Sequence, residues 1–177
     1  MAGRRPSAVV RGIDAVTGFL EHRGVPYEIV EHNPAYSAVA EARAAAADPE
    51  ATAKTIALHD RDGYRLAVVP ASERLDVRRA REVLGASHHL RLATEEELER
   101  DFPASEVGAL PPFGTARLPE VVDVGLLRHQ RIVCTGGEHR CSVRIAMLDL
   151  LRITEPRVAD ICEHPEEREP AEKLPSF

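Results

Sequence analysis

The sequence predicts a single-domain α+β fold in which helices pack on a mixed β-sheet or barrel. Segments with helical spacing and segments with strand spacing are interspersed along the 177 residues, without the regular βαβ spacing of a doubly wound fold. Hydrophobic residues make up 44% of the chain, which is enough for one packed core, and no internal repeat divides it. Aromatic residues are only 4%, so aliphatic side chains must form most of that core.

The first expected elements are a helix, a strand and a second helix. Apolar residues spaced as on one helix face predict a helix over 13–20, which Gly24 is suited to end. A strand is expected over 25–30. Ser37 can then cap an alanine-rich helix over 38–47.

The clearest local signal is a β-hairpin. Strands are expected over 53–58 and 64–69, because apolar residues fill both segments and the turn residues at 60–63 separate them. A helix should follow over 76–84. Gly85 is a suitable residue to end it.

Shorter elements are expected in the second half of the chain. A strand is expected over 90–92, and Thr94 with Glu97 forms a capping-box pattern that opens a helix ending before Pro103. Three short strands and a last helix complete the prediction, over 121–124, 131–134, 141–145 and 147–151.

Charge is distributed unevenly along the chain. The net charge is −6, and residues 155–177 hold seven acids but only three bases. This balance argues against non-specific nucleic-acid binding by the whole surface but leaves room for a local basic patch. We expect a flexible basic leader over 1–12, a folded domain over 13–162 and a dispensable acidic flexible tail over 163–177.

The cysteines and histidines do not form a recognisable metal or disulfide pattern. The chain has an odd number of cysteines, Cys134, Cys141 and Cys162, and none of them forms a CxxC pair. This pattern argues against a disulfide framework and a structural zinc site. The histidines lack HExxH spacing, so we expect no metal. Because there is no signal peptide and no apolar run of membrane-spanning length, a cytoplasmic protein without a membrane partner is expected.

Lys54 is the first candidate functional residue. It opens an apolar strand, and alternation places it on one face with Ile56 and Leu58, away from Thr55 and Ala57. One interpretation is a lysine at a strand end whose stem covers apolar surface while its charge stays in water. The other is a fixed cation for a phosphate group or a developing oxyanion.

Two glycine-containing loops and one basic cluster are weaker candidates. In the segment Gly108–Gly114, two prolines restrict the backbone beside two glycines, so the loop can wall a small pocket or serve as an ordinary turn. Thr135-Gly136-Gly137 can form a turn or allow close approach of a ligand. A cluster of arginines can be a solvated helix face or contact an RNA backbone, at Arg74, Arg78, Arg79 and Arg81.

Taken in chain order, several motifs match one known pattern. They are Gly24-Val25-Pro26-Tyr27, Glu31-His32-Asn33-Pro34, Ala53-Lys54-Thr55-Ile56, Ala67-Val68-Val69-Pro70, Leu75-Asp76, Gly108–Pro112 with Gly114, Arg117-Leu118-Pro119, Asp123, Thr135-Gly136-Gly137 and Ala159-Asp160-Ile161. With these motifs in this order, the chain resembles the YbaK and prolyl-tRNA-synthetase-associated editing domains. The resemblance covers residues 13–162, and the shared order makes it more specific than any single motif.

The resemblance implies a fold around a curved sheet and an enzyme that hydrolyses mischarged aminoacyl-tRNA. It implies that Lys54 contacts the terminal nucleotide and that the loop over 108–112 lines the amino-acid pocket. We therefore expect Lys54 to point into a pocket shared with that loop. No metal or organic cofactor is implied, and a ribose hydroxyl of the substrate is expected to assist the attacking water.

Further substrate-binding residues follow from the same resemblance. They are Thr55, Gly108, Pro111, Pro112, Phe113, Gly114, Thr135, Gly136, Gly137 and Ser142. Some members carry an aspartate where Ser142 stands, so this chain departs from the family there. The tRNA acceptor end is the expected partner, and an aminoacyl-tRNA synthetase is a second candidate.

Two alternatives remain open at the level of sequence. The fold can be kept while the protein only binds a ligand or a synthetase. An unrelated thiol enzyme would instead use Cys134 or Cys141 with a neighbouring histidine as base. The amino acid, the tRNA and the oligomeric state are not specified by the sequence.

Overall fold

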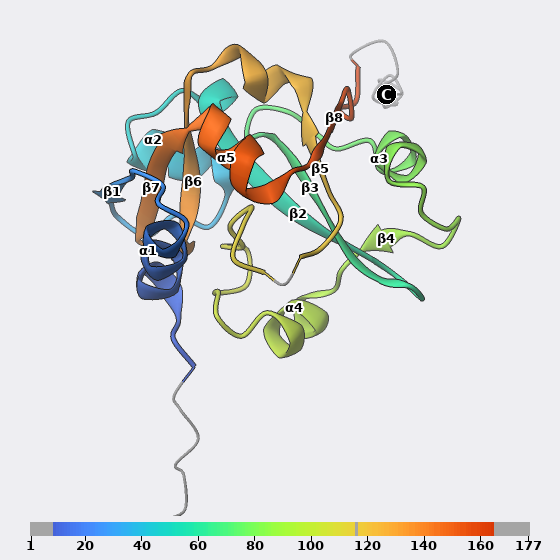
Figure 1. Cartoon of the computed structure of the whole chain (residues 1–177), viewed down its shortest axis with the longest axis horizontal. Helices are drawn as coiled ribbons and strands as arrows, with labels where there is room; N and C mark the ends of the chain where they lie inside the picture. Colours follow the sequence, from blue (N-terminus) through green and yellow to red (C-terminus); the bar gives the residue numbers. More distant parts are fainter. Residues whose placement is uncertain (1–8, 116, 165–177) are drawn as a thin grey trace, which may run out of the picture.

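The computed structural model describes residues 9–115 and 117–164, and a mixed sheet of eight strands runs through them (Figure 1). The strand order is β1-β7-β6-β2-β3-β5-β8, and β4 pairs with β2 off this path. The strands are β1 (Glu28–Glu31), β2 (Thr52–Asp60), β3 (Gly63–Pro70), β4 (Arg91–Leu92), β5 (Glu120–Asp123), β6 (Arg131–Glu138), β7 (Cys141–Ala146) and β8 (Arg157–Ala159). The predicted α+β class is confirmed, and the sheet is open rather than a closed barrel.

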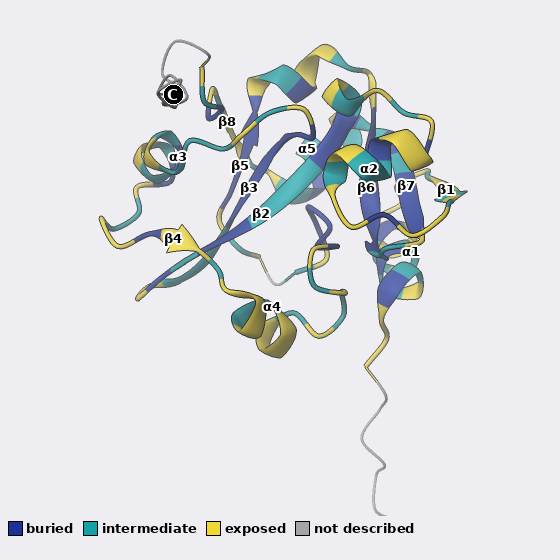
Figure 2. Ribbon diagram, turned by 180° about the vertical axis from the view of Figure 1, so that it is seen from behind, coloured by how far each residue is buried: buried dark blue, intermediate teal, exposed yellow. Residues whose placement is uncertain are grey.

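Five α-helices flank the sheet within the described part of the chain. They are α1 (Gly12–His22), α2 (Ala38–Ala44), α3 (Val77–Leu84), α4 (Glu95–Asp101) and α5 (Met147–Thr154), with short 3-10 helices η1 (Pro49–Ala51) and η2 (Val124–Arg128). Figure 1 shows α1 and α5 in front of the sheet, and Figure 2, seen from behind, shows α2 and α3 on the opposite side. Two layers of helices therefore enclose the central strands.

Local sequence signals account for the starts of α2, α3 and α4 and for the end of α3. Ser37 accepts a hydrogen bond from the Ala40 amide, and Thr94 with Glu97 forms the predicted capping box of α4. Asp76 caps α3, and Gly85 ends it with a φ of 62°. These interactions pair backbone groups that a helix end would otherwise leave without partners.

Two predicted boundaries are wrong for identifiable reasons. The strand expected from residue 25 begins at Glu28, because the Val25 amide bonds the Leu20 carbonyl and Pro26 has no N–H to donate. The second helix ends at Ala44 rather than at residue 47. Ala46 has a φ of 49°, and the Ala47 amide turns back to the Ala42 carbonyl.

The central strands combine antiparallel and parallel pairing. The predicted hairpin is confirmed, since β2 and β3 pair from Ala53↔Pro70 to Asp60↔Gly63. On its other edge β2 runs parallel to β6 over a short stretch, with Ala53 opposite Cys134. This stretch joins the β1-β7-β6 half of the sheet to the β2-β3-β5-β8 half.

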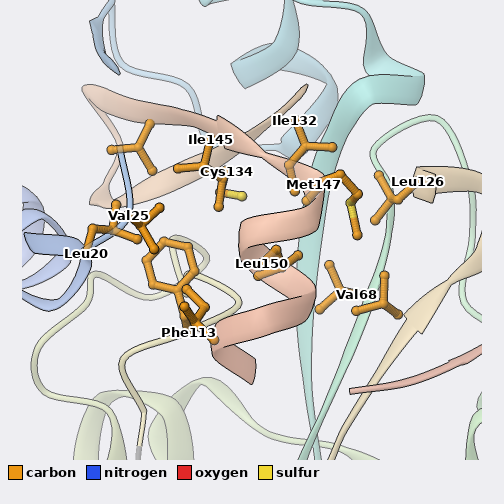
Figure 3. Packing of buried hydrophobic residues seen from close by; sticks show 14 of the residues in the cluster. Leu20, Val25, Val68, Phe113, Leu126, Ile132, Cys134, Ile145, Met147 and Leu150 are labelled. Carbon is orange, nitrogen blue, oxygen red and sulfur yellow. The ribbon is translucent and has the colours of Figure 1, made fainter. Parts of the chain in front are cut away.

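The core forms on both faces of β2 and β3. The largest cluster lies under α1 and α5, where Leu20, Phe113, Cys134 and Leu150 pack together (Figure 3). A second cluster lies on the opposite face and includes Ala80 and Leu84 of α3. Burying both faces explains why β2 and β3 are rich in aliphatic residues.

The predicted terminal segments fall mostly outside the described residues. Residues 1–8 of the expected leader and 165–177 of the expected tail lie there, so both predictions stand as made. The Glu163 amide donates to the Arg74 carbonyl, which joins the chain to the body of the protein at this point. None of the helices in the described ranges has the length and apolar character needed to cross a membrane.

Candidate functional site

Lys54 lies on the face of β2 that α3 covers. Ile56 and Leu58 share this face and pack in the α3 cluster, whereas Ala53 and Ala57 belong to clusters on the other face. The alternation predicted for this strand is therefore confirmed. The neighbouring residue Thr55 points to the opposite face, where its hydroxyl oxygen is buried without a hydrogen-bond partner among the described residues.

The Lys54 ammonium group is half-buried and has one hydrogen-bond partner among the described residues. Its Nζ atom donates to the Glu73 carbonyl oxygen at 2.7 Å, and an ammonium group has two further N–H donors. Burial is the main cause that lowers the pKa of Lys54, and the neighbouring charge of Arg74 lowers it further, while Cys162 and Glu73 oppose the shift. A desolvated cation with free donors beside a second cation is suited to an anionic ligand.

Thr135 and Ser142 project from the same face of the sheet as Lys54. Ala53 is paired with Cys134 in the parallel register, so the next residues, Lys54 and Thr135, share the opposite face. Thr135 is in turn directly opposite Ser142 in the β6–β7 pair. The tertiary structure thus brings Lys54, Thr135 and Ser142, which come from three strands, to the face of the sheet where α2 and α3 lie.

Ser142 is the centre of a buried polar network. Its Oγ atom donates to Glu41 Oε1 at 2.5 Å and lies 2.9 Å from His32 Nε2. The other ring nitrogen of His32 lies 2.8 Å from the Asn33 carbonyl oxygen. Burial raises the pKa of Glu41, and the Ser142 hydroxyl and the nearby His32 and His139 partly offset this rise.

His139 connects this network to the start of the proline-rich loop. Its ring nitrogens lie 3.0 Å from the carbonyl oxygens of Ala35 and Val107. Carbonyl oxygens only accept, so a ring nitrogen of His139 forms such a hydrogen bond where it carries a proton. Gly108 lies directly beside this ring, and Tyr36 packs against it at 4.8 Å between ring centroids. The loop therefore begins next to the segment that leads into α2.

The rest of the loop packs on the opposite face of the sheet. Leu110 packs with Ala57 and Leu66, and Phe113 packs in the cluster under α1 and α5. Pro111, Phe113 and Gly114 line a cavity of about 370 Å³ that also contains side chains from α1 and α4. Buried apolar contacts thus hold the middle of the loop in place.

The expectation that Lys54 points into a pocket shared with the loop over 108–112 is wrong. The Lys54 side chain and the side chains of Leu110 and Phe113 occupy opposite faces of β2. Strand alternation determines which residues share a face, but only tertiary packing decides on which face a distant loop lies. Gly108 is the end of the loop that approaches the α2 side.

The double glycine at the end of β6 packs against α1. A Cβ atom on Gly136 would meet Ile13 at 2.9 Å and the Cys141 carbonyl oxygen at 2.8 Å, and one on Gly137 would meet the Gly12 backbone. This close approach accounts for both glycines without a ligand. Their role in substrate binding remains a prediction.

Several groups in the site were not found from the sequence. His32 stands inside a matched motif but was given no role, and Glu41 lies in an alanine-rich helix with no local feature to single it out. The spacing of the histidines, His139 among them, is informative only about metal binding. The contacts of these residues join positions about one hundred apart, such as Ser142 and Glu41. Local spacing therefore carries no signal for them.

The environment of the cysteines argues against thiol chemistry. All three thiols are buried, and burial is the main cause that raises their pKa values, to about 11 for Cys141 and well above the usual range for Cys134. The thiolate, which is the nucleophile, is therefore scarce near pH 7. Within the described ranges, no group of three or more histidine, cysteine or acidic side chains could hold a metal ion.

Comparisons with known proteins support one family. Residues 32–153 match the model of the aminoacyl-tRNA editing domain. A crystal structure of "a putative trans-editing enzyme for prolyl tRNA synthetase" is 29% identical, with a TM-score of 0.78 over 89% of this chain and 100% of that one. A scaffold protein from a study of computational epitope grafting is 29% identical, with a TM-score of 0.77 over 86% and 97% of the two chains. A hypothetical protein at 24% identity, with a TM-score of 0.75 over 84% and 99%, shares the fold.

Proposed function

Because the chain belongs to the aminoacyl-tRNA editing domain family, we propose that it is a stand-alone deacylase that hydrolyses mischarged aminoacyl-tRNA. The observation that carries the proposal is the family match over residues 32–153, which includes Lys54, the proline-rich loop and Ser142. The partner is then the acceptor end of a tRNA. The proposed location of the protein is the cytoplasm.

The proposed reaction needs positioning more than a strong protein base. An aminoacyl ester is already activated. Holding the ester, the attacking water and a ribose hydroxyl in the reactive geometry can therefore supply much of the rate enhancement. Lys54 keeps two N–H donors for a phosphate oxygen of the terminal nucleotide or for the developing oxyanion. Arg74 is a second cation close enough to lower the pKa of Lys54, so it adds to the positive charge at this site.

The amino acid is proposed to bind near the Gly108 end of the loop. Gly108 lies beside His139, whose ring is bonded to the segment before α2. Thr135 and Ser142 face this side of the sheet, so they can contribute polar contacts to the substrate. The next loop residues are buried, so they would support the wall of the amino-acid pocket from its buried side. They are Pro111, Pro112 and Phe113.

The tRNA backbone is proposed to cross the surface of α3. Arg74, which precedes α3, and Arg78, which lies on it, are both exposed. Arg78 keeps 62% of its side chain in solvent, although its guanidinium group lies 3.7 Å from the Asp76 carboxylate. Arg79 is engaged with Asp76 and Asp160, which leaves it less available. Because phosphate contacts release counterions, binding through this patch should weaken as salt rises. A synthetase that delivers the tRNA is a further proposed partner.

A deacylation screen tests the proposal directly. Purified full-length protein is mixed with a panel of tRNAs carrying correct and incorrect amino acids, and release of the amino acid is followed with time. We expect faster release than spontaneous hydrolysis for one or a few small aminoacyl groups. Binding of charged tRNA without accelerated release of any member of the panel would instead identify a non-catalytic binding module.

A further inference from the structure

A second cavity lies on the face of the sheet away from Lys54. It has a volume of about 300 Å³ and lies between α1, α5 and the segment that connects the proline-rich loop to β5. Phe19, Pro112 and Phe113 form apolar walls. Pro112 and Phe113 belong to the loop itself, so this cavity lies behind the proposed pocket wall and is separate from the Lys54 site.

Glu120 supplies an unusual polar group to this cavity. As the first residue of β5 it is only 7% exposed, and its Oε1 atom has no hydrogen-bond partner among the described residues. Burial raises the pKa of Glu120 to about 8, and the Thr154 hydroxyl only partly opposes the rise. The carboxyl group is therefore mainly protonated at neutral pH and can donate a hydrogen bond. A buried polar group without a partner is unfavourable, so a bound molecule that supplied the partner would be stabilised.

Three arginines line the same cavity and are exposed to solvent. They are Arg23, Arg117 and Arg152. Arg152 is paired with Asp149 at 3.0 Å, whereas Arg23 and Arg117 have no carboxylate within ion-pair distance in the described ranges. The guanidinium group of Arg23 lies 5.4 Å from the centre of the Phe19 ring. The exposed Glu155 also lines the cavity, but Arg23 and Arg117 together outweigh its single negative charge. In a protein of net charge −6, these two arginines beside the buried Glu120 make a local site for an anion.

We propose that this cavity binds a small organic phosphate or carboxylate, with the anionic group held by Arg23 and Arg117 and a hydrogen-bond acceptor of the ligand facing the Glu120 carboxyl group. The apolar walls fit the carbon skeleton between these two ends. Phosphate and carboxylate share the oxyanion geometry that guanidinium groups bind in a bidentate manner. Because Pro112 and Phe113 form part of the wall, the bound molecule contacts the loop from its buried side.

The first test measures ligand binding, which does not depend on deacylation. Isothermal titration calorimetry of the full-length protein at pH 7 uses AMP, inorganic phosphate and acetate as probes. We expect AMP to bind more tightly than inorganic phosphate, because only AMP can also contact the apolar walls. Arg117→Gln should weaken the binding of AMP about tenfold, as expected for loss of one charge-assisted contact. Arg131→Gln on β6, an exposed arginine outside both proposed sites, is the matched control and should leave the affinity for AMP unchanged.

The second test uses the ionisation of Glu120. Above about pH 8 the carboxylate repels an anion, so the affinity of the wild type for AMP should fall about tenfold between pH 7 and pH 9. Glu120→Gln keeps the shape and a donor but cannot ionise, so its affinity should change little over this range. Equal pH profiles for the two proteins, or unchanged affinity in Arg117→Gln, would overturn the proposal. Loss of AMP binding in Lys54→Ala would also overturn the proposal, because that result would assign the nucleotide to the opposite face of the sheet.

Discussion

At the scale of single residues, Lys54 combines partial burial with an incomplete set of hydrogen bonds. If it holds a phosphate or the developing oxyanion, its loss affects every substrate alike. We expect Lys54→Ala to reduce kcat/KM about 10²-fold for each aminoacyl-tRNA that the protein cleaves, the usual effect of removing one oxyanion donor. Arg131→Ala, which removes an exposed cation elsewhere, is the control. A loss confined to one amino acid would show that Lys54 determines selectivity instead.

Ser142 illustrates how one hydroxyl can satisfy two titratable side chains. It donates to Glu41 and lies within hydrogen-bond distance of His32, and these residues come from β7, α2 and the segment after β1. Ser142→Ala leaves the buried Glu41 carboxyl group without this donor, so we expect the free energy of unfolding to fall by about 1–3 kcal/mol.

Urea denaturation measures this effect. Ser72→Ala, at an exposed serine, should change the free energy of unfolding by less than about 0.5 kcal/mol. If the two variants were equally stable, the network would contribute nothing to the folded state, and Ser142 would have to be explained by substrate binding alone.

At the scale of elements, the segment from Gly108 to Gly114 is anchored by buried side chains in its middle and by His139 at its start. A pocket wall that is anchored at both points should exclude substrates with a large amino-acid side chain by steric clash. We expect Pro112→Ala to relax the wall and reduce discrimination against bulky aminoacyl groups about tenfold, with smaller effects on the preferred substrate.

The deacylation panel measures this prediction, with Pro156→Ala as a control outside the loop. Selectivity is the ratio of kcat/KM values for small and large aminoacyl groups. If Pro112→Ala slowed all substrates equally and left this ratio unchanged, the loop would not act as a size filter.

At the scale of the whole molecule, Glu120 links stability to pH. Its pKa in the folded protein is about 8, above the ordinary 4.5, so the folded state holds a proton that the unfolded chain releases. The contribution of Glu120 to the free energy of unfolding is fully present below about pH 4.5. It is lost as the pH rises through 8, at roughly 1.4 kcal/mol per pH unit between these two values.

Glu120→Gln should therefore gain stability relative to the wild type as the pH is raised from 5 to 8. Melting temperatures measured across this range provide the test, with Glu99→Gln on the exposed surface of α4 as the control. A constant difference between Glu120→Gln and the wild type at all pH values would show that Glu120 does not carry the raised pKa.

The whole molecule is also expected to work without a metal ion. The proposed reaction relies on positioning by Lys54 and by the substrate's own hydroxyl, and the described residues offer no clustered set of metal ligands. We expect exhaustive chelation to leave the deacylation rate unchanged. Loss of activity on chelation and its recovery with zinc would show that this metal-free mechanism is wrong.

The sequence by itself determined the features that depend on near neighbours. Periodicity and turn residues predicted the β2–β3 hairpin, and capping residues such as Ser37 and Thr94 marked helix starts. The order of short motifs identified the family, and alternation correctly placed Lys54 with Leu58.

Only the tertiary structure decided which of these pieces meet. The parallel pairing of β2 with β6 puts Thr135 beside Lys54 on one face, and the packing of Leu110 puts the middle of the loop on the other. The contacts of Ser142 with Glu41, and the burial of Glu120, likewise arise between segments far apart in the chain. Periodicity specifies how side chains alternate within one strand, whereas the pairing of distant strands and the burial of a charge are set by packing of the whole chain.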